Sequence, residues 1–543
     1  MPVVSFDYHD FISLLGSRIS KEELIDKLPL IGGDLDSVQG DTIHIEFFPN
    51  RPDLVSVEGI ARACRGFLNI TTGLQTYPVQ SSQITTVIDA SVKPVRPFIA
   101  TAFVSCVTMT DELIGSLMEL QEKLHGGIGR NRKKLAIGVH DNTNITPPFT
   151  YKAVDPKSAS FVPLGTSKEM NLAQILLDHE KGKDYAHLLQ NMQRYPLLVD
   201  SKNNVLSFPP IINGCLTEVT YDTTDVFIDV TGTDPLAMHY ALNILVTALA
   251  ERGGLIHQTT VVDENQTQVF PNLQPSSMTI TLDEINSLLG TSLSIEQAQD
   301  CLKRMGYDAT SKEKKIVASV PAWRADILHP VDLIEDVAIG FGYECFTSLF
   351  PKALTFGGTT KHQQIIDVFR TLMIGLGFQE VTTFTITNKN QEFTYMGLPL
   401  CAHCVELENP LGEEYSILRM SLLPSLLGIL RENKHHCLPQ KLFEIGIVLD
   451  ESYKNLYHLS GVVIDAKANF TQCKSLVEAI GRDTGYSFVF SSSQHPGFVT
   501  GRQAHICYKQ KNIGVFGELH PQTIRNFSLE HPIIGFEWDL SQL

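Results

Sequence analysis

The chain has 543 residues, of which 43% are hydrophobic and 19% charged, and its formal net charge at pH 7 is −17. This length exceeds what one hydrophobic core supports. At ~150 residues per domain it predicts three or four domains of a soluble globular protein. The negative charge argues against a protein that coats nucleic acid with its whole surface.

Neither a targeting segment nor a membrane span is visible in the sequence. The first residues, MPVVSFDYHD, lack a basic segment followed by an apolar one, and no apolar run approaches the ~18 residues of a membrane helix. The ten cysteines lie mostly within apolar segments, as reduced thiols do, rather than in a disulfide framework. We therefore expect a cytoplasmic protein.

The first elements form a small module. Residues 11–36 predict two helices, the first of which closes on Leu-Leu-Gly. Ser20 caps the second helix, with Glu23 completing a capping box, and Gly32 ends that helix in the left-handed conformation. A strand and a last helix complete the module, at 42–54 and 55–67.

The region 85–267 mixes strands and helices. It contains a strand-like run at 97–109 and a helical pattern at 111–125. The basic segment GRNRKK at 129–134 is a candidate surface for nucleic acid, although a solvated loop is the simpler explanation of such a segment on its own. Residues 268–277, with two prolines and no periodicity, predict a linker.

The module then recurs. Residues 285–310 align without a gap with residues 11–36, and a strand and a helix follow at 315–327 and 332–343. Both strands end on Arg-x-Asp. Chance is a poor explanation for so long a parallel, which predicts one helix–helix–strand–helix module present twice. The cap positions of the second copy are Ser294, Gln297 and Gly306.

Four acidic residues crowd the last helix of the second copy: Asp326, Asp332, Glu335 and Asp336. With Pro330 in the first turn, the last three fall at i, i+3 and i+4 on one face, where like charges repel unless a cation lies between them. Hard oxygen ligands indicate Mg²⁺ rather than zinc. A solvated acidic helix start, favoured by the helix dipole, is the alternative.

The first copy builds the same module with fewer acids. It keeps Asp53 and Glu58 but has Val55 and Gly59 where the second copy has two of its acids. The additional acids are therefore not needed to build the module, which favours a function for them.

Residues 355–543 predict helices that flank an antiparallel sheet. Within them, CAHC at 401–404 and HHC at 435–437 offer the thiolates and imidazoles of a zinc site. A long segment separates the two, and loop cysteines with surface histidines are the alternative. The segment GIGR at 127–130 lacks a Rossmann context, and neither a P-loop nor a G-x-S-x-G motif is present.

The paired segments FPNRPDLVSVEGIARACRG and VPAWRADILHPVDLIEDVAIGFGYE resemble the beta subunits of phenylalanine–tRNA ligases, in their archaeal and eukaryotic cytosolic form. Further resembling segments follow in the family's order, at 124–141, 197–214, 225–234, 418–427 and 441–450. The resemblance implies a multidomain α+β chain with four domains. These are a first module at 1–80, a mixed α/β tRNA-editing domain at 85–267, a second winged-helix-like module at 272–348 and a class II synthetase-like domain at 355–543.

The same resemblance implies partners and cofactors. The chain would pair with an alpha subunit as an alpha2beta2 tetramer that binds phenylalanine tRNA, with no membrane and no DNA partner. ATP would be used at the alpha-subunit site. A magnesium site shared with that subunit would map onto Asp326, Asp332, Glu335 and Asp336.

The middle domain would hydrolyse tyrosine wrongly attached to the phenylalanine tRNA. The positions that match the family's editing site are Leu198, Ser207, Asp229 and Thr231. Asp229 and Thr231 lie two apart, so they point the same way from a strand, and Leu198 would form an apolar wall for the ring. Ordinary turn and cap chemistry is the alternative for the three polar residues.

The last domain lacks the cations of a class II catalytic site. In the class II sites that this domain resembles, an arginine stands on a strand two residues before a glutamate. Here Glu444 is present, but Leu442 takes the arginine's place. The sequence ends at Leu543 without room for the second arginine that clamps the far phosphates. Phosphoryl chemistry depends on positioned cations, so we expect a non-catalytic structural mate.

Three functions therefore remain open. The first is a non-synthetic subunit of a heteromeric aminoacyl-tRNA synthetase that also carries a deacylase. The second is a free-standing synthetase, against which the missing arginines count. The third is a nucleic-acid-binding adaptor built on winged-helix-like modules, which the net acidity disfavours for DNA.

Overall fold

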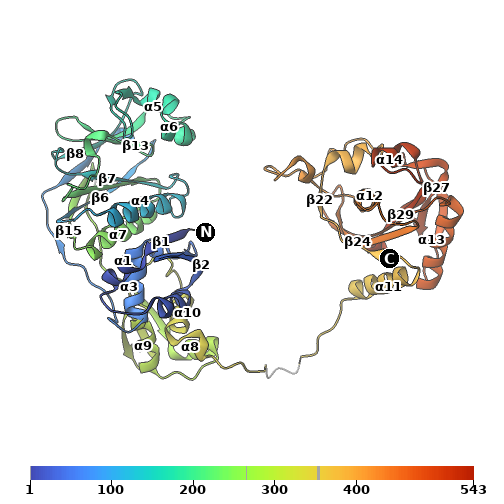
Figure 1. The fold of residues 1–543 in the computed structure, drawn as a ribbon, viewed down its shortest axis with the longest axis horizontal. Helices are drawn as coiled ribbons and strands as arrows, with labels where there is room; N and C mark the ends of the chain where they lie inside the picture. The colour runs from blue at the N-terminus through green and yellow to red at the C-terminus, as the bar shows by residue number, and fades with distance from the viewer. Residues whose placement is uncertain (1, 265, 351–354) are drawn as a thin grey trace. The chain divides into compact units, whose positions relative to one another are not determined.

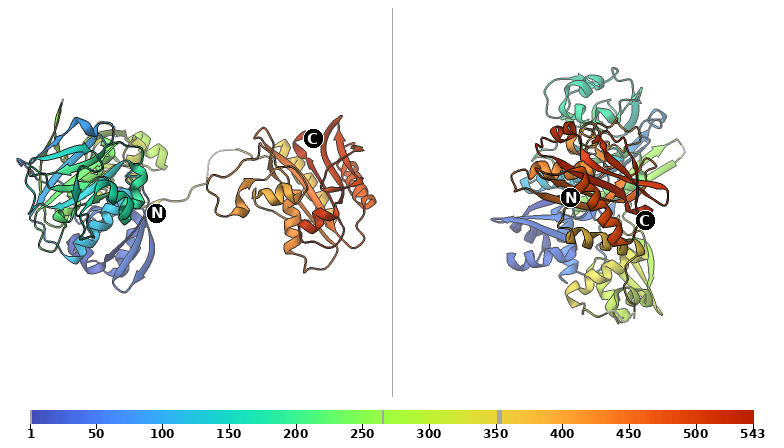
Figure 2. Two further views of the ribbon diagram at one scale, coloured as in Figure 1. Left: turned by 90° about the horizontal axis from the view of Figure 1, so that it is seen from above. Right: turned by 90° about the vertical axis from the view of Figure 1, so that its right-hand side faces the viewer.

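Two units make up the chain, Met1–Leu349 and Phe350–Leu543. The structure, a computed structural model, describes residues 2–264, 266–350 and 355–543. Each unit contains both helices and strands (Figures 1 and 2), so the expected multidomain α+β class is confirmed. The break predicted between residues 348 and 355 includes 351–354, which lie outside the described residues. None of the described helices combines the length and apolar character that crossing a membrane requires.

The first unit begins with a module of three strands and three helices. They are β1 (Val3–Asp7), α1 (Tyr8–Leu15), α2 (Lys21–Lys27), β2 (Gly33–Gln39), β3 (Thr42–Phe47) and α3 (Val57–Phe67). The strands form an antiparallel sheet in the order β1-β3-β2. Alternate residues of β3 (Ile43, Ile45 and Phe47) are fully buried, because successive side chains of a strand point to opposite faces.

A second module in the same unit repeats this order of elements. They are β18 (Ser276–Thr281), α8 (Leu282–Leu289), α9 (Ile295–Arg304), β19 (Asp308–Lys312), β20 (Lys315–Val320) and α10 (Pro330–Phe341). The sheet order, β18-β20-β19, is also that of the first module. Gly16 and Gly290 end α1 and α8 with φ of 71° and 68°, the left-handed conformation expected after Leu-Leu-Gly.

Each module holds two more strands than the helix–helix–strand–helix order that the sequence predicts. One precedes the first helix, and the other is β2 or β19. The sequences of β2 and β19, GDLDSVQ and DATSK, are polar and lack the apolar alternation that marks a half-buried strand. Backbone pairing with β3 and β20 holds them in place, and a local pattern does not report that pairing.

The two modules contact each other through α3 and α9, at one end of the first unit (Figure 1). At the end of α9, Nη2 of Arg304 donates to the carbonyl oxygen of Phe67 at 2.9 Å. A Cβ atom at Gly66 would lie 2.5 Å from the carbonyl oxygen of Arg304, so this approach requires glycine.

Two sheets form the region between the modules. The five-stranded sheet has the order β4 (Val79–Gln80), β15 (Leu255–His257), β6 (Phe98–Ser105), β14 (Val226–Gly232) and β7 (Leu135–Asp141). The seven-stranded sheet has the order β13 (Ile212–Asn213), β12 (Val205–Phe208), β11 (Tyr195–Val199), β8 (Phe149–Val154), β5 (Thr85–Ile88), β16 (Thr259–Asp263) and β17 (Gln266–Phe270). Two smaller pieces are the strand pair β9 (Ser160–Phe161) and β10 (Met170–Asn171) and the short helices α5 (Leu172–Asp178) and α6 (Glu180–Tyr185). Helices α4 (Asp111–Gly126) and α7 (Pro235–Glu251) pack on the five-stranded sheet. The strand predicted within 97–109 and the helix predicted at 111–125 are confirmed as β6 and α4.

The linker predicted at 268–277 is shorter than expected. Residues 268–270 belong to β17, which pairs along its length with β16, and residues 276–277 begin β18. Only residues 271–275 connect the two strands. The β17 residues are mostly exposed, because β17 is an edge strand, and they therefore show no apolar periodicity.

The second unit is built on a seven-stranded sheet. Its order is β21 (Gln379–Glu380), β24 (Gln440–Leu449), β25 (Asn455–Ile464), β29 (Ile533–Asp539), β28 (Lys511–Leu519), β27 (Phe498–Tyr508) and β26 (Val489–Ser492). All neighbours are antiparallel except the pair β21–β24. Helices α11 (Lys361–Gly375) and α13 (Phe470–Thr484) share one core with the sheet, and α12 (Leu423–Glu432) and α14 (Pro521–Asn526) share the other. A short pair, β22 (Ile386–Thr387) and β23 (Ile417–Leu418), lies outside this sheet.

Candidate functional site

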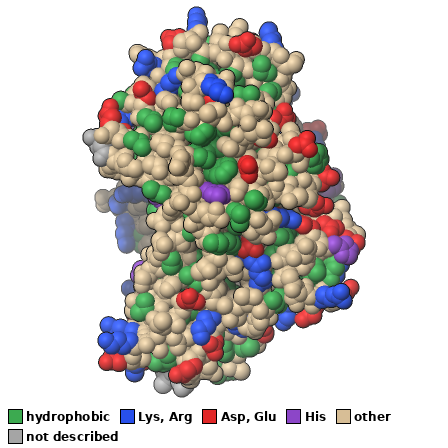
Figure 3. Space-filling model, turned by 90° about the vertical axis from the view of Figure 1, so that its left-hand side faces the viewer, with side chains coloured by type: hydrophobic (Ala, Val, Ile, Leu, Met, Phe, Trp, Pro, Cys, Tyr) green, Lys and Arg blue, Asp and Glu red, His purple; other side chains and the backbone are tan. Residues whose placement is uncertain are grey.

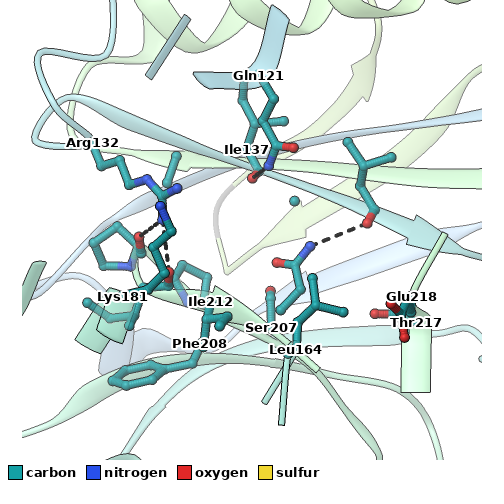
Figure 4. Close-up of a pocket in the computed structure, with 18 of the residues that line it drawn as sticks. Gln121, Arg132, Ile137, Leu164, Lys181, Ser207, Phe208, Ile212, Thr217 and Glu218 are labelled. Carbon is teal, nitrogen blue, oxygen red and sulfur yellow. Dashed lines mark hydrogen bonds between the residues drawn. The ribbon is translucent and has the colours of Figure 1, made fainter. Parts of the chain in front are cut away.

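A cavity of about 700 Å³ lies beside β7, the edge strand of the five-stranded sheet. We call it the β7 cavity. Side chains of α4, β7, β12 and β14 line it, with Lys181 of α6 and the segment at 164–166 also at its wall (Figure 4). Three of the four residues predicted for editing line this cavity: Ser207, Asp229 and Thr231. This volume suits a small-molecule site.

Asp229 is almost fully buried at this cavity and is held by one of its two oxygens. Its Oδ1 lies 2.7 Å from Nε2 of His140 and accepts a longer bond, 3.5 Å, from Oγ of Ser207. Nδ1 of His140 lies 2.8 Å from Oγ1 of Thr217. Because a carboxylate only accepts, Nε2 of His140 donates to Asp229, and Nδ1 is engaged by the Thr217 hydroxyl. Oδ2 of Asp229 has no hydrogen-bond partner within the described part of the chain.

Gly138 makes room for the pair of Asp229 and His140. It is the cross-strand neighbour of Asp229. A Cβ atom at Gly138 would lie 2.3 Å from Oδ1 of Asp229 and 2.6 Å from Nε2 of His140. The hydrogen bond between these two side chains therefore depends on a glycine in the edge strand.

Arg96 fixes Thr231 from behind the cavity. This buried arginine donates from Nε to Oγ1 of Thr231 at 3.1 Å and from Nη2 to the carbonyl oxygen of Thr231 at 2.8 Å. Burial lowers the pKa of Arg96 to about 10. A positive charge thus lies beside the two polar residues of β14.

Side chains complete the exposed backbone edge of β7. Nε2 of His125 accepts from the amide of Ile137 at 2.8 Å, and Nε2 of Gln121 donates to the carbonyl oxygen of Ile137 at 2.8 Å. Burial lowers the pKa of His125, which keeps the ring neutral and able to accept. These bonds cap an edge strand and keep its backbone from pairing elsewhere.

The basic segment at 129–134 is only partly a surface patch. Arg132 is buried, donates to the carbonyl oxygens of Pro210 and Ile211 and pairs with Glu122 at 2.7 Å (Figure 4). A hydrogen bond from His125, with Arg132 adding to it, lowers the pKa of Glu122 to about 2. Acidic and basic side chains are interspersed on the face seen in Figure 3. The structure thus makes Arg132 part of the cavity wall and not a free phosphate ligand.

Leu198 is not at the cavity. It lies in β11, has no exposed surface, and is the cross-strand neighbour of Ser207 and Tyr151 in the core. The inference of an apolar wall from Leu198 is therefore not supported by its place in the structure. Apolar walls come instead from Leu117, Met118 and Ile137.

Sequence reasoning missed His140, Gly138, Thr217 and Arg96. His140 and Gly138 lie two apart in LAIGVHD, and the strand period of two places them on the face of β7 that meets Asp229. That spacing is a usable signal once β7 and β14 are known to pair. Arg96 and Thr217 lie in irregular segments, and no local pattern marks them.

The four acids of the second module have separate environments. Asp326 and Asp336 both accept from Arg324, with Nη2 at 2.7 Å from an oxygen of each. Tyr307 also donates to Asp336. Asp332 accepts from the amides of Leu328 and His329 as a helix cap, and Glu335 is exposed.

Arg324 contacts two of these acids as a positive charge within the chain, and Arg51 lies 4.0 Å from one of them, Asp326. Burial of Arg324 disfavours its charge, but Asp336, Tyr307 and Asp326 outweigh that effect and hold its pKa well above the usual value. The all-carboxylate set suits Mg²⁺ by chemistry. Among the described residues, however, no three Asp, Glu, His or Cys side chains lie together in a group that could hold a metal ion. The four acids of this chain by itself therefore do not form a magnesium cage.

Leu442 is buried in the core that α12 shares with the sheet. Two residues on, Glu444 accepts from Nη1 of Arg419 at 2.8 Å and from Oγ1 of Thr383 at 2.6 Å. Glu444 is thus already paired inside the chain. Among the residues that the structure describes, Cys401 and Cys404 likewise do not lie with a histidine or another cysteine in a group that could hold a metal ion.

Family models match the second module and the second unit. The model of the phenylalanyl tRNA synthetase beta chain CLM domain matches residues 347–540, and the tRNA synthetase B5 domain matches residues 278–343. The phenylalanine–tRNA ligase beta subunit of Methanothrix thermoacetophila is 46% identical, with all of both chains covered. That of Archaeoglobus fulgidus is 45% identical over all of this chain and 98% of its own.

A solved structure agrees with the sequence relatives. It is an N-terminal fragment of the phenylalanyl-tRNA synthetase beta subunit from Pyrococcus horikoshii, 39% identical with a TM-score of 0.61. The match covers 63% of this chain and 99% of the fragment. Because identity is high over the full length of several relatives, this chain belongs to the family of phenylalanine–tRNA ligase beta subunits.

Proposed function

We propose that this chain works with an alpha subunit to attach phenylalanine to its tRNA, and that its β7 cavity hydrolyses tyrosine attached in error. The observation that carries the second part is Asp229, buried at the cavity and held by His140 through one oxygen only. A synthetic pocket for phenylalanine gains only limited discrimination against an added hydroxyl, so a second site must reject tyrosine.

The cavity offers tyrosine what phenylalanine cannot use. Leu117, Met118 and Ile137 provide apolar walls for an aromatic ring. Oδ2 of Asp229 would accept the phenolic hydroxyl. With phenylalanine the ring would cover that oxygen and leave it unpaired, at a cost of about 1–3 kcal/mol, which corresponds to roughly 5- to 150-fold in preference.

His140 acts here as a positioning residue. Both of its ring nitrogens are engaged, by Asp229 and by Thr217, so it is not placed to take a proton from water. We therefore infer that the hydroxyl of the tRNA's own terminal ribose orients the attacking water, together with backbone groups at the cavity. Asp229 selects the substrate, and Thr231 with Arg96 fixes the strand that carries it.

The synthetic reaction belongs to the alpha subunit in this proposal, with ATP bound there. Leu442 stands at the position of the phosphate-holding arginine, and Glu444 is taken up by Arg419. The second unit then supports the active partner in an alpha2beta2 tetramer. A free-standing synthetase is the second candidate. The chain without its partner should show no ATP–pyrophosphate exchange with phenylalanine, and exchange should appear when the alpha subunit is added.

Magnesium bound by Asp326, Asp332, Glu335 and Asp336 requires the partner in this account. Arg324 already neutralises two of the four acids, which leaves the exposed Glu335 and the capping Asp332 nearer to solvent. An ion held there would be completed by ligands from the alpha subunit and would act in assembly.

The editing proposal is tested by deacylation of preformed tyrosyl-tRNA by the assembled enzyme. Asp229→Ala and Thr231→Ala should each slow deacylation at least tenfold and leave phenylalanylation unchanged. Thr101→Val is the matched control, because Thr101 is buried opposite Asp229 on β6 but does not line the cavity. Clearance of tyrosyl-tRNA at the parent rate by both variants would place the site elsewhere.

A further inference from the structure

The second unit contains a cavity of about 600 Å³ that the proposed functions leave unused. We call it the Glu392 cavity. Residues at 392–403, the start of α12 and the strands β25, β28 and β29 line it. Its size falls within the range of small-molecule sites.

Glu392 lines this cavity and is only partly satisfied. The residue is 2% exposed. Its Oε1 accepts from the amides of Met420 and Ser421 at 2.8 and 2.7 Å. Its Oε2 is buried and has no hydrogen-bond partner among the described residues. A buried carboxyl oxygen without a partner is costly, and such an atom in a native fold calls for a ligand or another explanation.

The neighbouring acid, Glu537, accepts hydrogen bonds with both of its carboxyl oxygens. It accepts from Oγ of Ser421 at 2.7 Å, from the amides of Leu422 and Leu423, and from Nδ1 of His458 at 2.7 Å. Burial opposes its charge, but the bond from His458 and the other donors hold its pKa below the usual value. Glu537 is thus a satisfied carboxylate, and Glu392 is the group with spare capacity.

Burial raises the pKa of Glu392 to about 8, and the charge of Glu537 adds to that effect. Near neutral pH the free group therefore holds a proton, which passes to solvent when an ammonium binds the resulting carboxylate at Oε2. A cation at Oε2 would supply the missing partner and offset the repulsion between the two acids.

The rest of the cavity wall excludes acidic ligands. Its lining residues include three histidines and no lysine or arginine. A nucleotide phosphate or a free carboxylate would meet three glutamates, Glu392, Glu451 and Glu537, with no lysine or arginine among the lining residues. Much of the wall is apolar, from Phe393, Met396, Leu398, Leu423 and Val515.

We infer that the Glu392 cavity binds a small apolar primary amine without an acid group. The ammonium lies at Oε2 of Glu392, and the apolar body packs against Met396, Leu423 and Val515. This assignment concerns a site distinct from the β7 cavity, since its lining residues all belong to the second unit.

Calorimetry on the full chain tests this assignment with two probes of similar shape, 2-phenylethylamine and 3-phenylpropanoate. The amine should bind at least tenfold more tightly than the acid. Glu392→Gln should weaken amine binding at least tenfold. Glu478→Gln is the matched control, because Glu478 is an exposed acid of α13 that does not line the cavity, and it should leave the affinity unchanged.

Three results would overturn the assignment: equal binding of amine and acid, no amine binding to the parent at millimolar concentration, or parent-like affinity in Glu392→Gln. The comparison of the two probes uses the parent protein, so it decides the question even if Glu392→Gln does not fold.

Discussion

Arg51 of the first module lies with Nε 4.0 Å from Oδ2 of Asp326 in the second module. Each module also contains its own forked pair: Arg51 binds both oxygens of Asp53, and Arg324 binds both oxygens of Asp326. The Arg-x-Asp endings that the sequence repeats thus meet in one cluster of charges, in which Asp53 and Arg324 are buried and Arg51 and Asp326 are partly buried. The repeated Arg-x-Asp motif therefore occurs in both copies of the module and also forms a contact between them.

Removal of Arg324 should strongly destabilise the first unit. Arg324→Met leaves Asp326 and Asp336 without their shared countercharge, and breaking a buried pair in this way costs about 3–5 kcal/mol. Denaturant unfolding, followed by a signal of the first unit, measures the loss. Arg502→Met is the matched control, because the Arg502–Glu518 pair is largely exposed at the arginine and should contribute little to stability. Equal stability of the two variants would contradict the role of Arg324.

The exposed acid Glu335 offers the cleanest test of a shared magnesium site. Glu335→Ala should leave the isolated chain as stable as the parent but weaken its assembly with the alpha subunit in the presence of Mg²⁺. Asp336→Ala is unsuitable because Asp336 is buried against Arg324 and Tyr307 and its loss would disturb the fold. Analytical ultracentrifugation with and without chelator gives the assembly constant. A tetramer that neither chelator nor Glu335→Ala affects would argue against metal at this surface.

The space that Gly138 leaves should be essential for editing. In Gly138→Ala the new methyl group collides with Asp229 and His140, so we expect at least a tenfold slower deacylation of tyrosyl-tRNA. Phenylalanylation should be unchanged, since the collision is confined to the β7 cavity. Gly115→Ala, in α4, adds a methyl group with no atom within 4 Å and serves as the control. Full editing by Gly138→Ala would show that the Asp229–His140 bond is dispensable.

The buried Glu392 should make stability fall with rising pH. Its usual pKa of 4.5 is raised to about 8 in the folded chain, so the folded state binds more protons than the unfolded state between these values. The contribution of Glu392 to stability is therefore fully present below about pH 4.5 and is lost as pH rises towards about 8. Glu392→Gln should flatten this part of the pH profile of thermal unfolding. A parent and a variant with parallel profiles would contradict the raised pKa.

Sequence reasoning identified the helices of both modules, the helix α4, the duplicated module and three residues that line the β7 cavity, because those features depend on local periodicity or on motifs of the family. It missed the polar strands β2 and β19, which only pairing with β3 and β20 stabilises. It also missed His140 and Arg96, because their contacts join strands and loops distant in sequence. Leu198 shows the converse: the resemblance aligns it with an editing position, but the strand turns its side chain into the core.

The acids of α10 show a further limit of the sequence. Their spacing predicts a cation between like charges, and Arg324, six residues before Pro330, supplies a positive charge to Asp326 and Asp336 from within the chain. A periodicity argument along one helix does not see a residue that enters from the preceding loop. The magnesium ligands therefore stay a prediction that concerns the assembled protein.

The measurement that tests the central claim most directly is accumulation of tyrosyl-tRNA during aminoacylation with tyrosine by the assembled enzyme. The parent should accumulate almost none, while Asp229→Ala should accumulate it steadily and still charge phenylalanine at the parent rate. If the Asp229→Ala enzyme stays as free of tyrosyl-tRNA as the parent, the β7 cavity is not the editing site.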